Sequence, residues 1–319
     1  MISRVADHCF WFGRYLERAE STARMLAQAA SFALDAELSP AQVWRPIVVV
    51  SGEEDEFLAR VAAGDDDHPA WGDGEAVQRF MVWDTTNGVS LASSIAGARW
   101  NARSIREVLS LDAWEVTNEL HLWFTDAAPQ YATSRDEFYR HVRRSTQLSL
   151  GLLRSTMLHD EPLDFMWLGV LLERVNQTAR MLDVHHHAFT QMRGHELVET
   201  SLWISLLRAL SGQEAFMKRV TQRVSSELVA RFLIAEDAFP RSIAYCVHSA
   251  HERLAHIRPP EAHDLPGGQS LERLRVLDTW VVDRAKEPFP SVHDLLTHVV
   301  DEVHAICGTL GRELLGALP

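Results

Sequence analysis

The chain has 319 residues, of which 46% are apolar and 24% charged, and its 31 basic and 44 acidic side chains give a net charge of −13. This composition is ordinary for a globular protein with a large buried core, and the length allows either one large domain or two of average size. The acidic balance argues against nucleic acid and against an anionic membrane surface as the main partner, because both require a basic face.

Helical periodicity begins at the start of the chain. In residues 1–30, apolar side chains recur at alternating steps of four and three, which places them on one stripe of a helix. The short apolar run Ile47–Val50 is interpreted as a buried helical segment, because its surroundings are helical. The same periodicity predicts further helices at about residues 91–110, 136–157, 165–187, 196–210, 213–235, 243–256, 270–285 and 292–316.

Polar, turn-rich segments separate these elements. Residues 64–74 read GDDDHPAWGDG and residues 258–268 read RPPEAHDLPGG, and both compositions are typical of loops. Ser291 follows a proline-rich break and is suited to cap the last helix. No linker is long enough to tether freely moving domains. The pattern therefore predicts an all-α, multi-helix bundle.

An internal repeat organises this bundle. WFGRYLERAESTARML at residues 11–26 aligns with WLGVLLERVNQTARML at residues 167–182, at an offset of 156 and with ten of sixteen positions identical. Fainter echoes follow in the same order: Trp44…Phe57 with Trp203…Phe216, and Phe80…Ser90 with Phe232…Ser242. We therefore predict a single domain over residues 1–319, built from two pseudo-symmetric halves of about 1–157 and 158–319. Their first helices should pack near a pseudo-two-fold axis.

Charged side chains lie beside the apolar stripe of the repeated helices. One flank of the first copy carries Gly13, Glu17, Glu20 and Arg24; the second copy keeps Gly169, Glu173 and Arg180 but has Asn176 in place of Glu20. A glycine one turn before a glutamate lets another helix approach closely. The glutamate can then be partly buried against a cation, which would lower its pKa.

Three interpretations of these Glu-Arg residues stay open. They fix the register between helices and bind nothing, as buried ion pairs often do. Alternatively, they line a pseudo-symmetric polar cleft for a charged ligand or peptide, with the candidates Glu17, Arg18, Arg24, Glu173, Arg174 and Arg180. In the third interpretation, Glu17 or Glu173 is the general acid or base of an all-helical enzyme that forms or hydrolyses amide bonds.

The segment ARWNARSIRE, residues 98–107, is a second candidate surface. Arg99, Arg103 and Arg106 are spaced i, i+4 and i+7 and would share a helical face, and guanidinium groups suit carboxylate or phosphate recognition. Asn101 and Glu107 belong to the same segment. The alternative is that these arginines only pair with carboxylates, namely Glu17, Glu173 or Glu107.

Histidines and cysteines give no clear metal site. His185–His187 would point in three directions on a helix, whereas His248 and His251 could share a site with Glu252 nearby. The sequence has no HExxH, no pair of Glu-x-x-His helices, no P-loop, no GxGxxG and no GxSxG. We therefore predict no metal and no cofactor.

The cysteines and the N-terminal residues bear on the compartment. The three cysteines, Cys9, Cys246 and Cys307, form no CxxC pair, which is typical of buried thiols in a reducing compartment. Residues 1–30 lack the apolar stretch of a signal peptide, and no segment approaches the ~18 apolar residues of a membrane span. We expect a cytoplasmic protein.

Taken together, these motifs resemble the bacterial Alpha-E family, a helical domain named for its Glu-Arg motif. The resemblance rests on FWFGRYLERAE at residues 10–20 with Ala23-Arg24, on Asp84…Asn87…Ser90, on residues 98–118, and on Leu172-Glu173-Arg174 with Thr178-Ala179-Arg180. It spans nearly the whole chain. The sequence departs from the family pattern at Gly88, where proline is more frequent, and at Trp100, where an acidic residue is more frequent.

The resemblance implies a context rather than a reaction. Members of the family are encoded beside, or fused to, circularly permuted ATP-grasp ligases, often with transglutaminase-like proteins. That context implies an accessory role in a peptide- or amide-bond-forming system. We therefore expect a non-catalytic binding or scaffold subunit. Its Glu-Arg helices and its Arg99–Arg106 stripe would bind a substrate peptide, an acyl-phosphate intermediate or the ligase itself.

Overall fold

The computed structural model describes residues 3–35, 39–62, 73–190, 196–286, 289 and 291–316. Within these ranges the chain forms fifteen α-helices and no strand, which confirms the predicted all-α class. No helix among the described residues is long and apolar enough to cross a membrane. In chain order the helices are α1 (Ser3–Asp35), α2 (Pro40–Ser51), α3 (Glu54–Ala62), α4 (Gly74–Val82), α5 (Leu91–Ser104), α6 (Leu111–Thr125), α7 (Ala128–Thr133), α8 (Arg135–Thr156), α9 (Glu161–Thr190), α10 (Glu196–Ala209), α11 (Gln213–Arg219), α12 (Ser226–Ala235), α13 (Ile243–Ile257), α14 (Gly268–Arg284) and α15 (Val292–Glu313).

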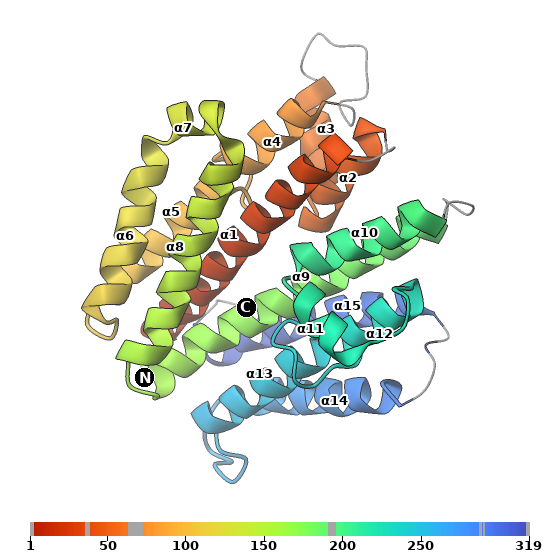
Figure 1. The fold of residues 1–319 in the computed structure, drawn as a ribbon. Helices are drawn as coiled ribbons and strands as arrows, with labels where there is room; N and C mark the ends of the chain where they lie inside the picture. The colour runs from red at the N-terminus through yellow and green to blue at the C-terminus, as the bar shows by residue number, and fades with distance from the viewer. Residues whose placement is uncertain are drawn as a thin grey trace.

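Two long helices, α1 and α9, pack against each other at the centre of the bundle (Figure 1). Helices α5 and α8 pack on α1, and α6 packs on both of them. In the same way, α13 and α15 pack on α9, and α14 packs on both of them. The order of contacts thus recurs along the chain. Buried apolar side chains from Ala6 to Leu315 form one hydrophobic cluster that includes both halves.

Two glycines set the distance between α1 and α9. A Cβ on Gly13 would lie 1.9 Å from the carbonyl oxygen of Met166, and a Cβ on Gly169 would lie 2.1 Å from that of Phe10. Both residue pairs, Gly13 with Gly169 and Phe10 with Met166, are 156 residues apart. The contact is therefore reciprocal, as in an isologous interface. The two backbones touch where the sequence places a glycine one turn before each glutamate.

The fainter echoes also have matching local structure. Ser90 and Ser242 are the N-caps of α5 and α13, where each hydroxyl accepts a hydrogen bond from a backbone N–H three residues on. The Phe57 and Phe80 rings meet edge to face at 5.3 Å between centroids, and the rings of Phe216 and Phe232 do so at 5.4 Å. These pairs anchor α3 to α4 and α11 to α12.

Several sequence-based boundaries are confirmed. Ile47–Val50 lies inside α2, a loop joins α13 to α14 between Ile257 and Gly268, and Ser291 caps α15 by accepting from the Asp294 N–H. Most of the predicted loop at residues 64–74 lies outside the described residues. Of the three cysteines, all are free, and Cys9 and Cys246 are buried.

Two predicted helices are wrong in extent. Residues 213–235 form two helices rather than one, because Val220 adopts an extended backbone and the Ser225 hydroxyl caps α12. The helix predicted at residues 91–110 ends at Ser104, since Ile105 leaves the helical conformation. Helices α6 and α7 occupy a stretch for which periodicity made no prediction.

Candidate functional site

The α1–α9 crossing buries a carboxylate from each helix. Glu17 on α1 is fully buried, and its Oε2 accepts a hydrogen bond from Nη2 of Arg174 on α9 at 2.7 Å. Its Oε1 accepts from Nη1 of Arg241, in the turn before α13, at 2.7 Å, and from the Ser21 hydroxyl at 3.3 Å. Both carboxylate oxygens of Glu17 are thus held by guanidinium groups.

The reciprocal pair is formed by Glu173 on α9. Arg18 donates to it from two nitrogens, Nε to Oε1 at 2.7 Å and Nη2 to Oε2 at 3.0 Å. Arg14, one turn earlier on α1, donates from Nε to Oε2 at 2.8 Å. The crossing therefore pairs Glu17 with Arg174 and Glu173 with Arg18, which are equivalent positions in the predicted repeat.

Electrostatics keep both of these carboxyl groups ionised. Burial raises the pKa of Glu17 and of Glu173, but the neighbouring guanidiniums outweigh burial and hold each pKa below its ordinary value. A general acid or base at neutral pH needs a pKa near 7 and a free proton-accepting position. Neither carboxylate meets these conditions in this structure.

The two sides of the crossing are called its first half, around Glu17, and its second half, around Glu173. The first half contains a second carboxylate. Glu20 forms an ion pair with Arg24 one turn along α1 and accepts from Gln147 Nε2 at 3.0 Å. Its Oε2 accepts from Nη2 of Arg241 at 2.7 Å, so Arg241 bridges Glu20 and Glu17. Every carboxylate in this half therefore has at least two guanidinium partners.

The second half lacks two of these groups. Asn176 stands where Glu20 would recur, and Val89 stands where Arg241 would recur in the Phe80…Ser90 echo. As a result Arg180, the equivalent of Arg24, forms no ion pair with any carboxylate among the described residues. Its Nη1 donates to the Val50 carbonyl at 3.4 Å. Burial lowers the pKa of Arg180, and nearby Arg18 and Arg14 lower it further, whereas the carboxylates of Glu173 and Glu53 raise it.

A pocket of about 190 Å³ opens at this unneutralised half of the crossing. Its lining includes Arg14, Arg18 and Arg180, together with Glu173. The lining thus carries three guanidiniums and one carboxylate, on a chain whose net charge is −13, and the Glu53 carboxylate also acts on Arg180 electrostatically. Asn176 and Val89 also line this pocket, so the two departures from the repeat coincide with its walls.

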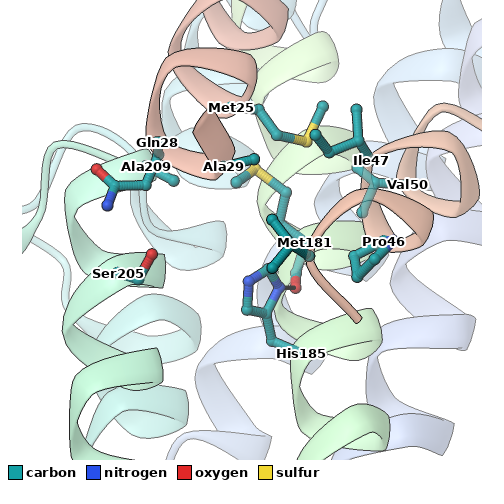
Figure 2. A pocket seen from close by; sticks show the side chains of 11 residues that line it. Met25, Gln28, Ala29, Pro46, Ile47, Val50, Met181, His185, Ser205 and Ala209 are labelled. Carbon is teal, nitrogen blue, oxygen red and sulfur yellow. Dashed lines mark hydrogen bonds between the residues drawn. The ribbon is translucent and has the colours of Figure 1, made fainter. Parts of the chain in front are cut away.

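A smaller, mostly apolar pocket of about 60 Å³ lies beside it, between α1, α2, α9 and α10 (Figure 2). Met25 and Met181, another pair of repeat equivalents, both line it. His185 lies below Met181 in this view, and burial lowers its pKa, which favours the neutral ring. Because Met25 lines both pockets, a polar compartment and an apolar one adjoin.

The predicted basic stripe does not form. Arg106 lies beyond the end of α5 and stacks over the Trp114 ring at 5.0 Å, so it no longer shares a helical face with Arg99 and Arg103. Arg99 donates to the Asn118 side-chain oxygen at 2.8 Å, and Arg103 is exposed. In the described part of the chain, none of the three forms an ion pair with the carboxylates proposed for them: Glu17, Glu173 and Glu107.

The remaining candidates of that segment also lie apart from the crossing. Asn101 is buried, and its side-chain oxygen lies 2.8 Å from His8 Nδ1, while Glu107 is exposed. His248 and His251 both approach one oxygen of Asp278, at 3.0 and 3.3 Å. The described residues include no group of three or more side chains that could hold a metal ion.

Several residues at the crossing are not among the candidates predicted from the sequence. Glu20 lies on the same helix flank as Glu17, and Arg14 lies one turn before Arg18, so the sequence contains a signal for both. Arg241 and Gln147 come from distant parts of the chain. No local pattern points to either of them.

Comparison with known proteins covers most of the chain. The Alpha-E family model, described as a predicted alpha-helical domain with a conserved ER motif, matches residues 1–315. Uncharacterized proteins of Mycobacterium bovis and Mycobacterium tuberculosis are each 24% identical over 284 residues, an alignment that covers 85% of this chain. The alignment covers 30% of the length of those relatives. No solved structure matches the chain.

Proposed function

The chain belongs to the Alpha-E family, and we propose that it is a non-catalytic accessory domain whose Glu-Arg cleft binds an anionic ligand or partner group. The observation that carries this proposal is the charge imbalance at the α1–α9 crossing. Glu17 and Glu173 each pair with two arginines, while Arg180 lines the pocket and forms no ion pair among the described residues. A cation left unneutralised beside a cavity favours binding of an anion from outside the chain.

The occupied carboxylates weaken the alternative of an amide-forming or amide-hydrolysing enzyme. That alternative needs Glu17 or Glu173 to exchange a proton with a substrate. The lowered pKa of each carboxyl means that it carries no proton to donate at neutral pH. The two guanidinium partners of each carboxylate occupy the oxygens that would accept a proton from a substrate. A role in binding needs only the charge, which the site retains.

The proposed system is an ATP-grasp-type peptide or amide ligase in the cytoplasm, with the ligase as partner and a transglutaminase-like protein as a further component. This part of the proposal comes from the family resemblance. The free thiols of Cys9, Cys246 and Cys307 support the compartment. The chain spans less than a third of the length of the curated relatives it matches.

Affinity capture tests the proposed partnership. The full chain, tagged and expressed in its native host, should retain a circularly permuted ATP-grasp ligase from lysate at low ionic strength, as identified by mass spectrometry. Capture is repeated with the Arg180→Gln variant. The exposed Arg275→Gln change is its control for the loss of one positive charge, since Arg275 pairs with Glu272 on the surface of α14. Capture that contains no ATP-grasp protein under these gentle conditions would refute the partnership.

A further inference from the structure

We infer that the pocket lined by Arg14, Arg18 and Arg180 is an oxyanion site that holds one carboxylate or phosphate group. This inference rests on the proposed function, because it names the ligand class of the same cleft. Three features of the site support it: the free hydrogen-bond donors, the difference from the other half of the crossing, and the apolar pocket alongside.

Arg180 and Arg18 have hydrogen-bond donors that no described residue uses. Arg180 donates from Nη1 to the Val50 carbonyl, and its Nε and Nη2 have no hydrogen-bond partner among the described residues. These two nitrogens form the edge of the guanidinium that grips both oxygens of a carboxylate or two oxygens of a phosphate. Arg18 spends Nε and Nη2 on Glu173, which leaves its Nη1 for a third contact.

The two halves of the crossing differ in where their oxyanion comes from. In the first half, the chain supplies its own oxyanion: the Glu20 carboxylate, which Arg24 and Arg241 hold. In the second half, Asn176 replaces that carboxylate, and a pocket of about 190 Å³ lies between the arginines. The ligand's oxyanion thus takes the role that Glu20 plays on the other side of the crossing. One chain should accordingly bind one such group.

The apolar pocket indicates which substituent a bound oxyanion would carry. Met25 lines both the cationic pocket and the apolar pocket of about 60 Å³, which Figure 2 shows. That volume exceeds what one water occupies and suits a small apolar substituent. We therefore expect an oxyanion that carries a short apolar group to bind better than the bare ion.

Calorimetric titration of the full chain at low ionic strength tests the inference with two probes, inorganic phosphate and N-acetylalanine. We expect saturable binding of one equivalent of at least one probe. Binding of phosphate alone assigns a phosphate source, and binding of N-acetylalanine alone, or more tightly, assigns a carboxylate. Binding should weaken as salt is added, because the interaction is between charges at a partly open site.

Two variants separate a specific site from general attraction. Arg180→Gln removes the gripping edge and should weaken binding by about tenfold or more. Asn176→Glu restores the repeat's carboxylate one turn before Arg180 and should abolish binding while leaving the thermal midpoint equal or higher. Arg275→Gln, a surface change of the same charge as Arg180→Gln, should bind like the wild-type chain.

The inference is overturned if the wild-type chain binds neither probe, or if Asn176→Glu and Arg180→Gln bind as the wild type does. These outcomes are distinct from failure of the proposed function. A ligase captured equally by wild type and Arg180→Gln, with no probe binding, would retain the accessory role and reject the oxyanion site. Probe binding without ligase capture would retain the oxyanion site and reject the partnership with the ligase.

Discussion

At the scale of single residues, the α1–α9 crossing owes its character to charges that are buried in pairs. Glu173 is almost completely buried and receives hydrogen bonds from two arginines, and Glu17 has the same surroundings on the other side. Desolvating these groups costs free energy, which their mutual attraction offsets only while every partner is present. Changes at one member therefore act on all of its neighbours.

Replacing Glu173 by glutamine should destabilise the fold by about 3–5 kcal/mol, because Arg14 and Arg18 would stay buried without their counter-charge. The free energy of unfolding, from urea titration followed by circular dichroism, measures this loss. The matched control is Glu272→Gln, at an exposed ion pair on α14, which should leave the free energy of unfolding nearly unchanged. A Glu173→Gln protein as stable as the wild type would contradict the structural account.

Acid should unfold the protein through the same carboxylates. The pKa values of Glu17 and Glu173 are lower in the folded chain than the ~4.3 of an unfolded glutamate. Their contribution to stability is therefore complete above about pH 5, and falls as the pH drops below the unfolded value. Each carboxyl can contribute a slope of at most about 1.4 kcal/mol per pH unit there.

Urea titrations between pH 7 and pH 3 measure this slope, and the Glu173→Gln variant should show a shallower one than the wild type. A wild-type free energy of unfolding that stays constant from pH 5 to pH 3 would show that these carboxylates are not held by the arginines in solution.

At the scale of helices, the close approach of α1 and α9 depends on two missing methyl groups. Alanine at Gly13 or at Gly169 would bring Cβ within about 2 Å of a backbone carbonyl, which cannot move aside without separating the helices. The Glu-Arg pairs across the crossing would then lengthen together. We expect Gly13→Ala and Gly169→Ala to lower the thermal midpoint strongly or to prevent folding.

Gly151 provides the matched control for these substitutions. It lies inside α8, is exposed, and would meet no atom within 4 Å if it carried a Cβ. Because alanine is the better helix former, Gly151→Ala should stabilise the protein by about 0.4–1 kcal/mol. Thermal unfolding of the three variants side by side checks both expectations. A Gly13→Ala protein with a wild-type midpoint would mean that α1 and α9 do not touch.

Some helices and helix boundaries could be predicted from the sequence, and others could not. The stripe in residues 1–30 and the N-cap at Ser291 depend on local chemistry, and both predictions hold. The break between α11 and α12 depends on the Ser225 cap inside an otherwise helical pattern, which periodicity does not register. Arg106 leaves the expected face because α5 ends two residues before it, so a predicted surface disappeared through a small boundary error.

At the scale of the whole molecule, the internal repeat predicted more than composition could. It indicated that Gly13 and Gly169 belong to paired helices and that Glu17 and Glu173 occupy equivalent places, and the contacts across the crossing are reciprocal. The repeat could not place Arg241, which reaches Glu17 from a position more than 200 residues away. Nor could the repeat indicate that a pocket lies beside Asn176, which occupies the position equivalent to Glu20.

The predicted duplication also makes a claim about folding. If the chain is two fused copies of one helical half, residues 1–157 and 158–319 should each be a unit that needs the other, because α1 and α9 bury their crossing faces against each other. The cut falls between Thr156, where α8 ends, and Glu161, where α9 begins, so it breaks no helix. Expressed alone, each half would expose to water the apolar face that the other half covers in the intact chain. It would also leave Glu17 or Glu173 without its arginine partners from the other half.

We therefore expect each half alone to aggregate or to lack cooperative unfolding, and the two halves expressed together to assemble into a one-to-one complex with native helical content. Size-exclusion chromatography with light scattering and thermal unfolding by circular dichroism measure both properties. The Gly13→Ala change in the first half should abolish assembly, since it separates the backbones at the crossing, whereas Gly151→Ala should leave assembly intact. A first half that unfolds cooperatively as a monomer would show instead that the crossing joins two independent domains.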